Sequence, residues 1–127
     1  RGLGDVYKRQ TYARIQSVIR KAGDQGLSIP LSLPTGIVLT PKEESLIQLA
    51  AEYAAVVKQA GDEYNPALIA NYIYELVKEY NQFYHDYTIL KEENAALRDF
   101  RLVLSQEVGK IVKSGMSLLG IEVPDRM

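Results

Sequence analysis

The 127-residue chain contains no cysteine and no tryptophan, and its single histidine is His85. The absence of cysteine excludes a disulfide scaffold, thiol catalysis and every cysteine-based zinc site, and it fits a reducing, cytoplasmic compartment. One histidine cannot form a histidine-rich metal cluster, and it makes a catalytic triad a poor hypothesis. We therefore expect no metal ion and no catalytic residue in this chain.

Long hydrophobic runs and catalytic motifs are also missing. No apolar stretch approaches the roughly 18 residues that a membrane-spanning helix needs, so we expect a soluble protein with no membrane partner. There is no glycine-rich phosphate loop, no nucleophile elbow and no His-Glu-x-x-His pattern. What remains is the ordinary composition of one small globular domain, with 46% hydrophobic and 24% charged residues.

The first ten residues differ from the rest in showing no apolar periodicity. Residues 5–10, Asp-Val-Tyr-Lys-Arg-Gln, resemble a translated reading frame of the transposon end used to build sequencing libraries. We therefore expect residues 1–10 to be a non-native adaptor translation and residues 11–127 to be the domain. A disordered native tail is the alternative.

Apolar spacing in the remaining chain predicts helices and almost no strand. Residues 11–22 form one amphipathic pattern, and residues 23–39 read as a long connection with a short extended piece at 36–39. Cap-plus-proline pairs predict two further helix starts, and a last helix ends before a glycine. These three helices are expected from Thr40-Pro41 to Ala60, from Asn65-Pro66 to Tyr87, and from Glu92 to Leu119. The pattern predicts an all-α, antiparallel bundle of four to five helices.

The charges are distributed unevenly along this bundle. The whole chain has a formal net charge of −1, and residues 42–93 hold ten acidic residues against four basic ones. Basic residues slightly outnumber acidic ones on both sides of this segment, in residues 11–41 and 94–127. The two ends are therefore the candidates for contact with a polyanion.

Three groups of polar residues are candidates for a binding site. Arg14, Ser17, Arg20 and Lys21 form the polar side of the first helix, which is either a solvated face or a phosphate-binding one. The second group projects opposite the apolar stripe of the third expected helix and consists of Tyr74, Lys78, Asn81 and His85. An exposed tyrosine beside such polar groups can stack on an unpaired base.

Arg101 is the third candidate, because it falls inside the apolar arc of the last helix. A charge there needs a partner, which is either an acidic residue of the helix at 65–87 or a ligand in a cleft. Tyr84 lies at the edge of its own apolar arc and can either pack or stack on a base.

Four stretches of the sequence resemble the C-terminal DALR anticodon-binding domain of arginyl-tRNA synthetases, and together the resemblance covers residues 11–127. They are Ala13-Arg14-Ile15-Gln16-Ser17-Val18-Ile19-Arg20-Lys21, Tyr80-Asn81-Gln82-Phe83-Tyr84-His85 with Ile89-Leu90, Arg101-Leu102-Val103-Leu104, and the ending Gly115-Met116-Ser117-Leu118-Leu119-Gly120-Ile121-Glu122-Val123-Pro124-Asp125-Arg126-Met127. The ending is the most specific of the four.

This resemblance implies recognition of the anticodon loop of arginine tRNA by a helical domain. The parent enzyme, a class I arginine–tRNA ligase, would attach arginine with ATP on a catalytic domain of the same chain. We expect the present chain to lack that domain, to be inactive and to bind no cofactor itself. The alternative from composition is a helical bundle for protein–protein packing that does not bind RNA.

The resemblance, combined with residue chemistry, points to nine tRNA-binding residues. They are Arg14, Arg20, Lys21, Asn81, Tyr84, His85, Arg101, Arg126 and Met127. Relatives carry a Gln-Tyr pair where this chain has Arg9 and Gln10, so we expect a weakened affinity for tRNA. Ala54 stands where relatives often have proline, so we expect the second helix to run with less of a break than in those relatives.

Overall fold

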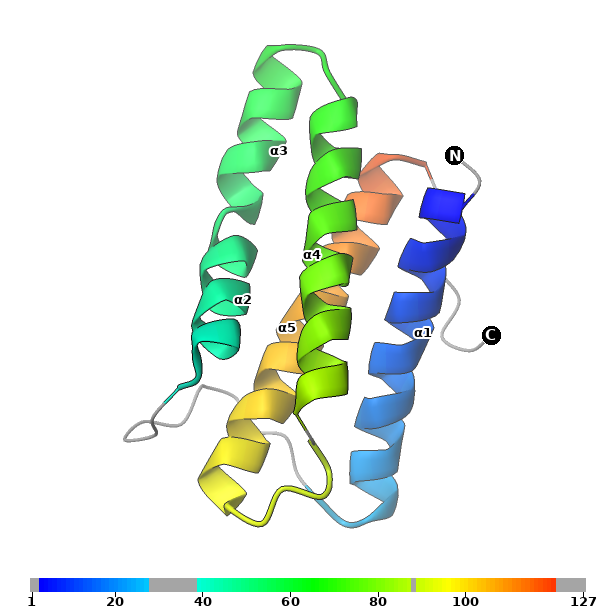
Figure 1. Cartoon of the computed structure of the whole chain (residues 1–127). Coiled ribbons are helices and arrows are strands. Elements are labelled where there is room, and N and C mark those ends of the chain that lie inside the picture. The colour runs from blue at the N-terminus through cyan, green and yellow to red at the C-terminus, as the bar shows by residue number, and fades with distance from the viewer. Residues whose placement is uncertain (1–2, 28–38, 88, 121–127) are drawn as a thin grey trace.

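The computed structural model describes residues 3–27, 39–87 and 89–120, which form five α-helices (Figure 1). These are α1 Leu3–Asp24, α2 Pro41–Ala51, α3 Tyr53–Asp62, α4 Ala67–Asp86 and α5 Ala95–Leu118. No strand occurs within these ranges, which confirms the predicted all-α bundle. The extended piece expected at 36–39 falls almost entirely outside them. No helix in the described part combines the length and apolar character needed to cross a bilayer.

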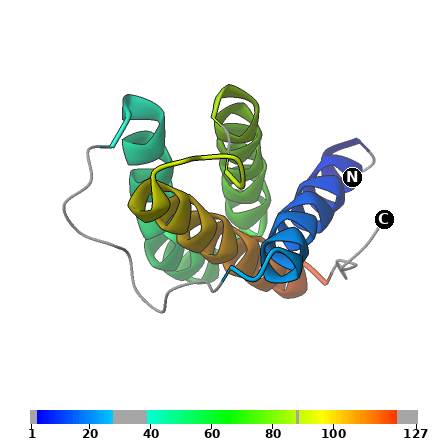
Figure 2. The same cartoon turned by 90° about the horizontal axis from the view of Figure 1, so that it is seen from below.

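Helix α4 is central to the bundle and contacts each of the other helices. It runs antiparallel to α5, with α1 on one side of this pair and α2 and α3 on the other (Figures 1 and 2). Helices α1 and α4 run in the same direction, so their C-terminal ends lie at the same end of the bundle. The candidate site is found at this end.

A side-chain cap begins α2, and a side-chain hydrogen bond just before Pro66 marks the start of α4. The Thr40 hydroxyl accepts a hydrogen bond from the Glu43 backbone N–H (3.3 Å), and the Glu43 carboxylate accepts one from the Thr40 backbone N–H (3.0 Å). Pro41 occupies the first helical position, where no intrahelical donor is needed. Before α4, the Asn65 side chain accepts a hydrogen bond from the Ala67 backbone N–H (3.2 Å). Both predicted starts are confirmed.

Helix α1 begins at Leu3, well before the expected start at residue 11. Once a helix is nucleated, each further residue adds a backbone hydrogen bond at little cost, so the helix continues through residues 3–10. The expected division of the chain after residue 10 therefore falls inside α1 and does not coincide with a helix end.

Helix α5 begins later than expected, at Ala95 and not at Glu92. The side chain of Asn94 accepts a hydrogen bond from the Leu97 backbone N–H (3.2 Å) and caps the helix there. Glu92 is thus left in the connection between α4 and α5, where its carboxylate contacts the side chain of Arg101.

The helix expected from Thr40-Pro41 to Ala60 is broken at Glu52, which separates α2 from α3. In an unbroken helix the Leu49 carbonyl would accept from the backbone N–H of Tyr53. Here it accepts from the Tyr72 hydroxyl of α4 (2.6 Å) and from the Glu52 backbone N–H (3.2 Å). Burial raises the pKa of Tyr72 far above its ordinary value, which keeps the phenol protonated as a donor. A tertiary contact therefore stabilises the break.

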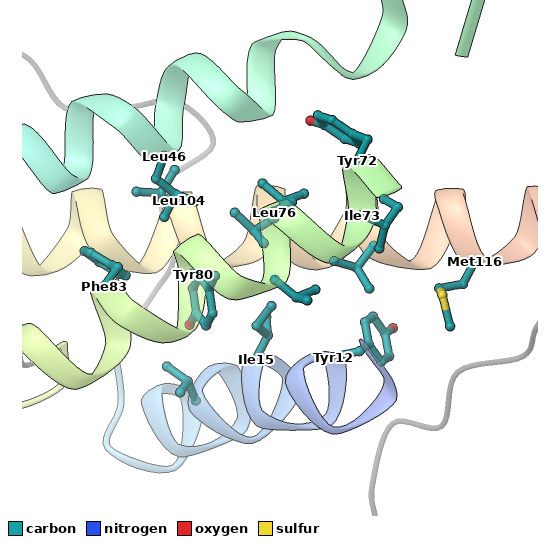
Figure 3. Close-up of a cluster of buried hydrophobic side chains, with 14 of the residues drawn as sticks. Tyr12, Ile15, Leu46, Tyr72, Ile73, Leu76, Tyr80, Phe83, Leu104 and Met116 are labelled. Carbon is teal, nitrogen blue, oxygen red and sulfur yellow. The ribbon is translucent and has the colours of Figure 1, made fainter. Parts of the chain in front are cut away.

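The core lies between α4, α5 and α1, and its side chains come from every helix (Figure 3). The largest fully buried apolar side chains are Ile15, Leu46, Ile73, Leu76, Val77, Tyr80, Phe83, Leu102, Val108, Val112 and Met116. Tyr80 is the one in this set with a hydroxyl, and it donates a hydrogen bond to Ser105 (2.9 Å). Burial raises the pKa of Tyr80 well above its ordinary value, so it too stays protonated.

Glycines in α5 allow α4 and α1 to pack closely against it. A Cβ atom added at Gly115 would lie 2.6 Å from Cδ1 of Ile73, and one added at Gly109 would lie 3.0 Å from Cγ2 of Ile15. No real Cβ atom tolerates the first of these distances without displacing its neighbour. A side chain larger than that of glycine at residue 115 would therefore force Ile73 to move.

We predict that Gly115→Ala lowers the free energy of unfolding by about 1–3 kcal/mol, because the added methyl group overpacks the contact with Ile73. Gly61→Ala in α3 is the matched control, because nothing lies within 4 Å of a Cβ atom there. Replacing this helical glycine should raise stability slightly. Chemical denaturation followed by circular dichroism measures both changes, and equal effects of the two substitutions would contradict the packing described here.

Candidate functional site

A groove of about 650 Å³ lies at the end of the bundle where α1 and α4 finish. Figure 2 views the molecule from this end. Helix α1 supplies one wall, and the last turn of α4 with the connection that follows it supplies the other. Most of the polar and aromatic residues around the groove fall into two sets. One set is Arg14, Ser17 and Lys21 of α1 with Gln25 just after its end, and the other is Tyr84, His85, Tyr87 and Lys91 of the opposite wall.

Arg14 is held across the groove by residues of α4. Its guanidinium carbon lies 4.8 Å from the centre of the Tyr84 ring, within the range of a cation–π interaction. Its Nη1 donates a hydrogen bond to Oδ1 of Asn81, whose Nδ2 donates in turn to the Thr11 hydroxyl (2.8 Å). The Arg14 side chain is therefore oriented before any ligand arrives.

Asn81 corrects the prediction that Tyr74, Lys78, Asn81 and His85 project together away from the apolar stripe. Asn81 is only 6% exposed and lies between α4 and α1, whereas Tyr74, Lys78 and His85 are exposed as predicted. The reason is that α1 packs along the Tyr74–Asn81 side of α4, where the rings of Tyr7 and Tyr74 lie 5.8 Å apart. We therefore assign Asn81 to the support of Arg14.

Only part of the predicted basic face of α1 lines the groove. Arg14, Ser17 and Lys21 line the groove, but Arg20 does not, because it projects from a different side of the helix and is half-buried there. Lys91 joins the groove from the opposite wall. Sequence periodicity missed Lys91 because it lies in a connection. Lys91 could have been found as a basic residue soon after the end of α4. Because α1 and α4 end at the same end of the bundle, such a residue lies near the basic face of α1.

Tyr84 packs against the core, which is one of its two predicted alternatives, and it also lines the groove. Its ring centroid lies 6.4 Å from that of Tyr80 in the core, and the half-buried side chain also lines the groove. His85, next to it, is exposed and lines the groove as well. The structure thus brings together Arg14, Lys21, Tyr84 and His85 of the predicted residues.

Arg101 was expected to contact either a ligand or an acidic residue of the helix at 65–87, and neither prediction is correct. Its side chain is buried, with Nε 3.1 Å from Oε2 of Glu43 in α2 and Nη1 3.0 Å from Oε1 of Glu92 in the α4–α5 connection. Nearly all of its surface is covered, so it has none to offer to RNA. Arg101 is therefore a residue of the interior.

Two further predicted residues, Arg126 and Met127, lie outside the described residues. In the part that the structure describes, no group of three or more histidine, cysteine, aspartate or glutamate side chains is placed to hold a metal ion. The groove thus offers guanidinium, ammonium, amide, hydroxyl and aromatic groups, which bind polar and planar ligands through hydrogen bonds, charge and stacking.

The chain belongs to the DALR anticodon binding domain family, whose model matches residues 9–127. It is 66% identical over 117 residues to the arginine–tRNA ligase of Phocaeicola vulgatus and 65% identical over the same length to that of Bacteroides thetaiotaomicron. Each alignment covers 92% of this chain. The chain spans about a fifth of the length of these relatives, 19% and 20% respectively.

Solved structures show the same fold. The arginyl-tRNA synthetase of Thermus thermophilus matches 95% of this chain with a TM-score of 0.83 at 28% identity, and the match covers 21% of that chain. A putative arginyl-tRNA synthetase from Campylobacter jejuni matches 98% of this chain with the same TM-score at 25% identity, over 26% of its own length. The helical bundle is therefore shared with synthetases of distant bacteria.

We predict that Asn81→Ala lowers the free energy of unfolding by about 1–3 kcal/mol, because Thr11 and Arg14 each lose a partly buried hydrogen-bond partner. Lys78→Ala, on the exposed side of the same helix, serves as the control and should change stability little. Thermal unfolding of the two variants tests this difference. A loss at Asn81 no larger than that at Lys78 would contradict the support role.

Proposed function

We propose that this chain is the anticodon-binding domain of an arginyl-tRNA synthetase and that its groove holds the anticodon loop of an arginine tRNA. The observation that carries this proposal is the Arg14 guanidinium lying across Tyr84 in the groove. In the parent enzyme, a catalytic domain would attach arginine to the tRNA with ATP, and the present domain would contribute recognition alone. Family membership and relatives that are arginine–tRNA ligases support this reading.

The chemistry of the groove suits an unpaired loop of RNA. Bases in such a loop are unstacked, so they can stack on aromatic rings and expose their edges to hydrogen bonding. Tyr84 supplies a ring, and Ser17 and Gln25 supply polar groups for base edges. Lys21 and Lys91 stand on opposite walls, where they can contact the phosphates on either side of a bound base.

The placement of charge matters more here than the net charge of −1. Arg14, Lys21 and Lys91 all line the groove, and Asp86 is the acidic residue among the groove-lining side chains. Nine of the ten acidic residues in the middle segment are absent from the groove lining, although Glu92 and Glu93 directly follow Lys91. This uneven distribution of charge makes the groove end of the bundle the part that attracts a polyanion. A protein-packing bundle would present an apolar face there, and the groove is lined in large part by charged and polar groups.

The direct test measures the affinity of the chain for an RNA hairpin with the anticodon stem and loop of an arginine tRNA. A second hairpin carries an altered anticodon on the same stem. We expect the second to bind at least about tenfold more weakly, because each base edge that is read contributes about 1–3 kcal/mol. Equal affinity for the two hairpins would defeat anticodon recognition.

Lys21→Gln adds an internal check on the position of the RNA. The variant should weaken binding of both hairpins and reduce the salt dependence by about one phosphate contact, a slope change of about 0.7. Lys58→Gln is the matched control, since Lys58 is exposed on α3 and pairs with Asp62 (2.7 Å). An equal effect of the two substitutions would place the RNA somewhere other than the groove.

A further inference from the structure

The buried side chain of Arg101 lies behind the groove wall that Tyr87 and residues 89–91 form. Its guanidinium carbon lies 5.1 Å from the centre of the Tyr87 ring. Its Nη1 donates a hydrogen bond to Oε1 of Glu92 (3.0 Å). Tyr87 directly follows α4, and Glu92 directly follows Lys91. Arg101 therefore contacts the chain at the start of the groove-lining connection and just past its end.

Arg101 is itself fixed in position by the start of α2. Its Nε donates a hydrogen bond to Oε2 of Glu43 (3.1 Å), and Glu43 is completely buried. The other oxygen of that carboxylate accepts from the backbone N–H of Thr40 (3.0 Å), as part of the α2 cap. The groove wall is thus tied through one guanidinium to the opposite side of the bundle.

Glu92 also orders the chain that follows it. Its Oε2 accepts a hydrogen bond from the Asn94 backbone N–H (3.1 Å), next to the first turn of α5. Its own backbone N–H turns back toward the Ile89 carbonyl (3.4 Å). The carboxylate of Glu92 therefore joins the groove-lining connection to both Arg101 and the start of α5.

We infer that Arg101, acting with Glu43 and Glu92, is a positioning residue that holds Tyr87 and the 89–91 connection in the conformation that accepts RNA. The inference rests on the proposed function of the groove. Buried ion pairs contribute little net stability compared with apolar packing of the same volume, and their best-attested use is to fix one arrangement of a structure. A wall that is already ordered also avoids the entropy cost of ordering it when the ligand binds.

The test compares Glu92→Gln with Glu93→Gln in the whole chain. Both substitutions remove one negative charge from adjacent positions, and Glu93 is exposed. Charge alone predicts that both variants bind the arginine-anticodon hairpin as tightly as the wild type or more tightly. Positioning predicts that Glu92→Gln weakens binding about three- to tenfold while Glu93→Gln does not.

Amide hydrogen exchange of the peptide covering residues 87–94 provides a readout that needs no RNA. Glu92→Gln should speed exchange there and leave the middle of α4 unchanged, with both variants folded by circular dichroism. If Glu92→Gln matches Glu93→Gln in exchange and in affinity, the positioning role is wrong. If the wild-type chain binds neither hairpin, the proposed function fails, and exchange alone then decides whether Arg101 orders the connection.

Discussion

The buried guanidinium of Arg101 is the interaction on which the arrangement of this bundle depends. It meets two carboxylates, those of Glu43 and Glu92, and lies against the ring of Tyr87. A cation this deeply buried is tolerated only when it is paired, so the elements that supply its partners must converge on it. These elements are the first turn of α2 and the stretch from the end of α4 through the α4–α5 connection, two separate parts of the sequence that meet at α5.

The position of the groove follows from this convergence and from the common direction of α1 and α4. Both helices end at the same end of the bundle, and each has a basic residue in its last turn, Lys21 in α1 and His85 in α4. Cations near helix C-termini are favoured by the helix dipole, so Lys21 also stabilises the helix that carries it. Arg14, held by Asn81 and Tyr84, completes a basic and aromatic surface on a chain whose net charge is slightly negative.

Local signals in the sequence predicted the helical class and the starts of α2 and α4, because caps such as Thr40 act on backbone groups a few residues away. These local signals failed where a side chain distant in the sequence determines the local structure or the burial of a residue. The break at Glu52 depends on the Tyr72 hydroxyl, Asn81 is buried because α1 covers it, and Arg101 takes its partners from α2 and a connection. A helical wheel describes one helix and cannot show which neighbour lies on its polar side. The same limit explains why only part of the candidate site was predicted. Arg14, Lys21, Tyr84 and His85 lie on helix faces, which a helical wheel describes. Lys91 lies in a connection, which it does not describe.

Mapping the RNA on the folded chain tests the central claim most directly. Titration of the arginine-anticodon hairpin into isotope-labelled chain, followed by nuclear magnetic resonance, reports which amides change environment. We expect the largest shifts on the groove walls, at Ser17 of α1, at Gln25 just after it, and at Tyr84 and Lys91 across from them, with little change in α3. Shifts centred on α2 and α3, or spread evenly over the bundle, would contradict it.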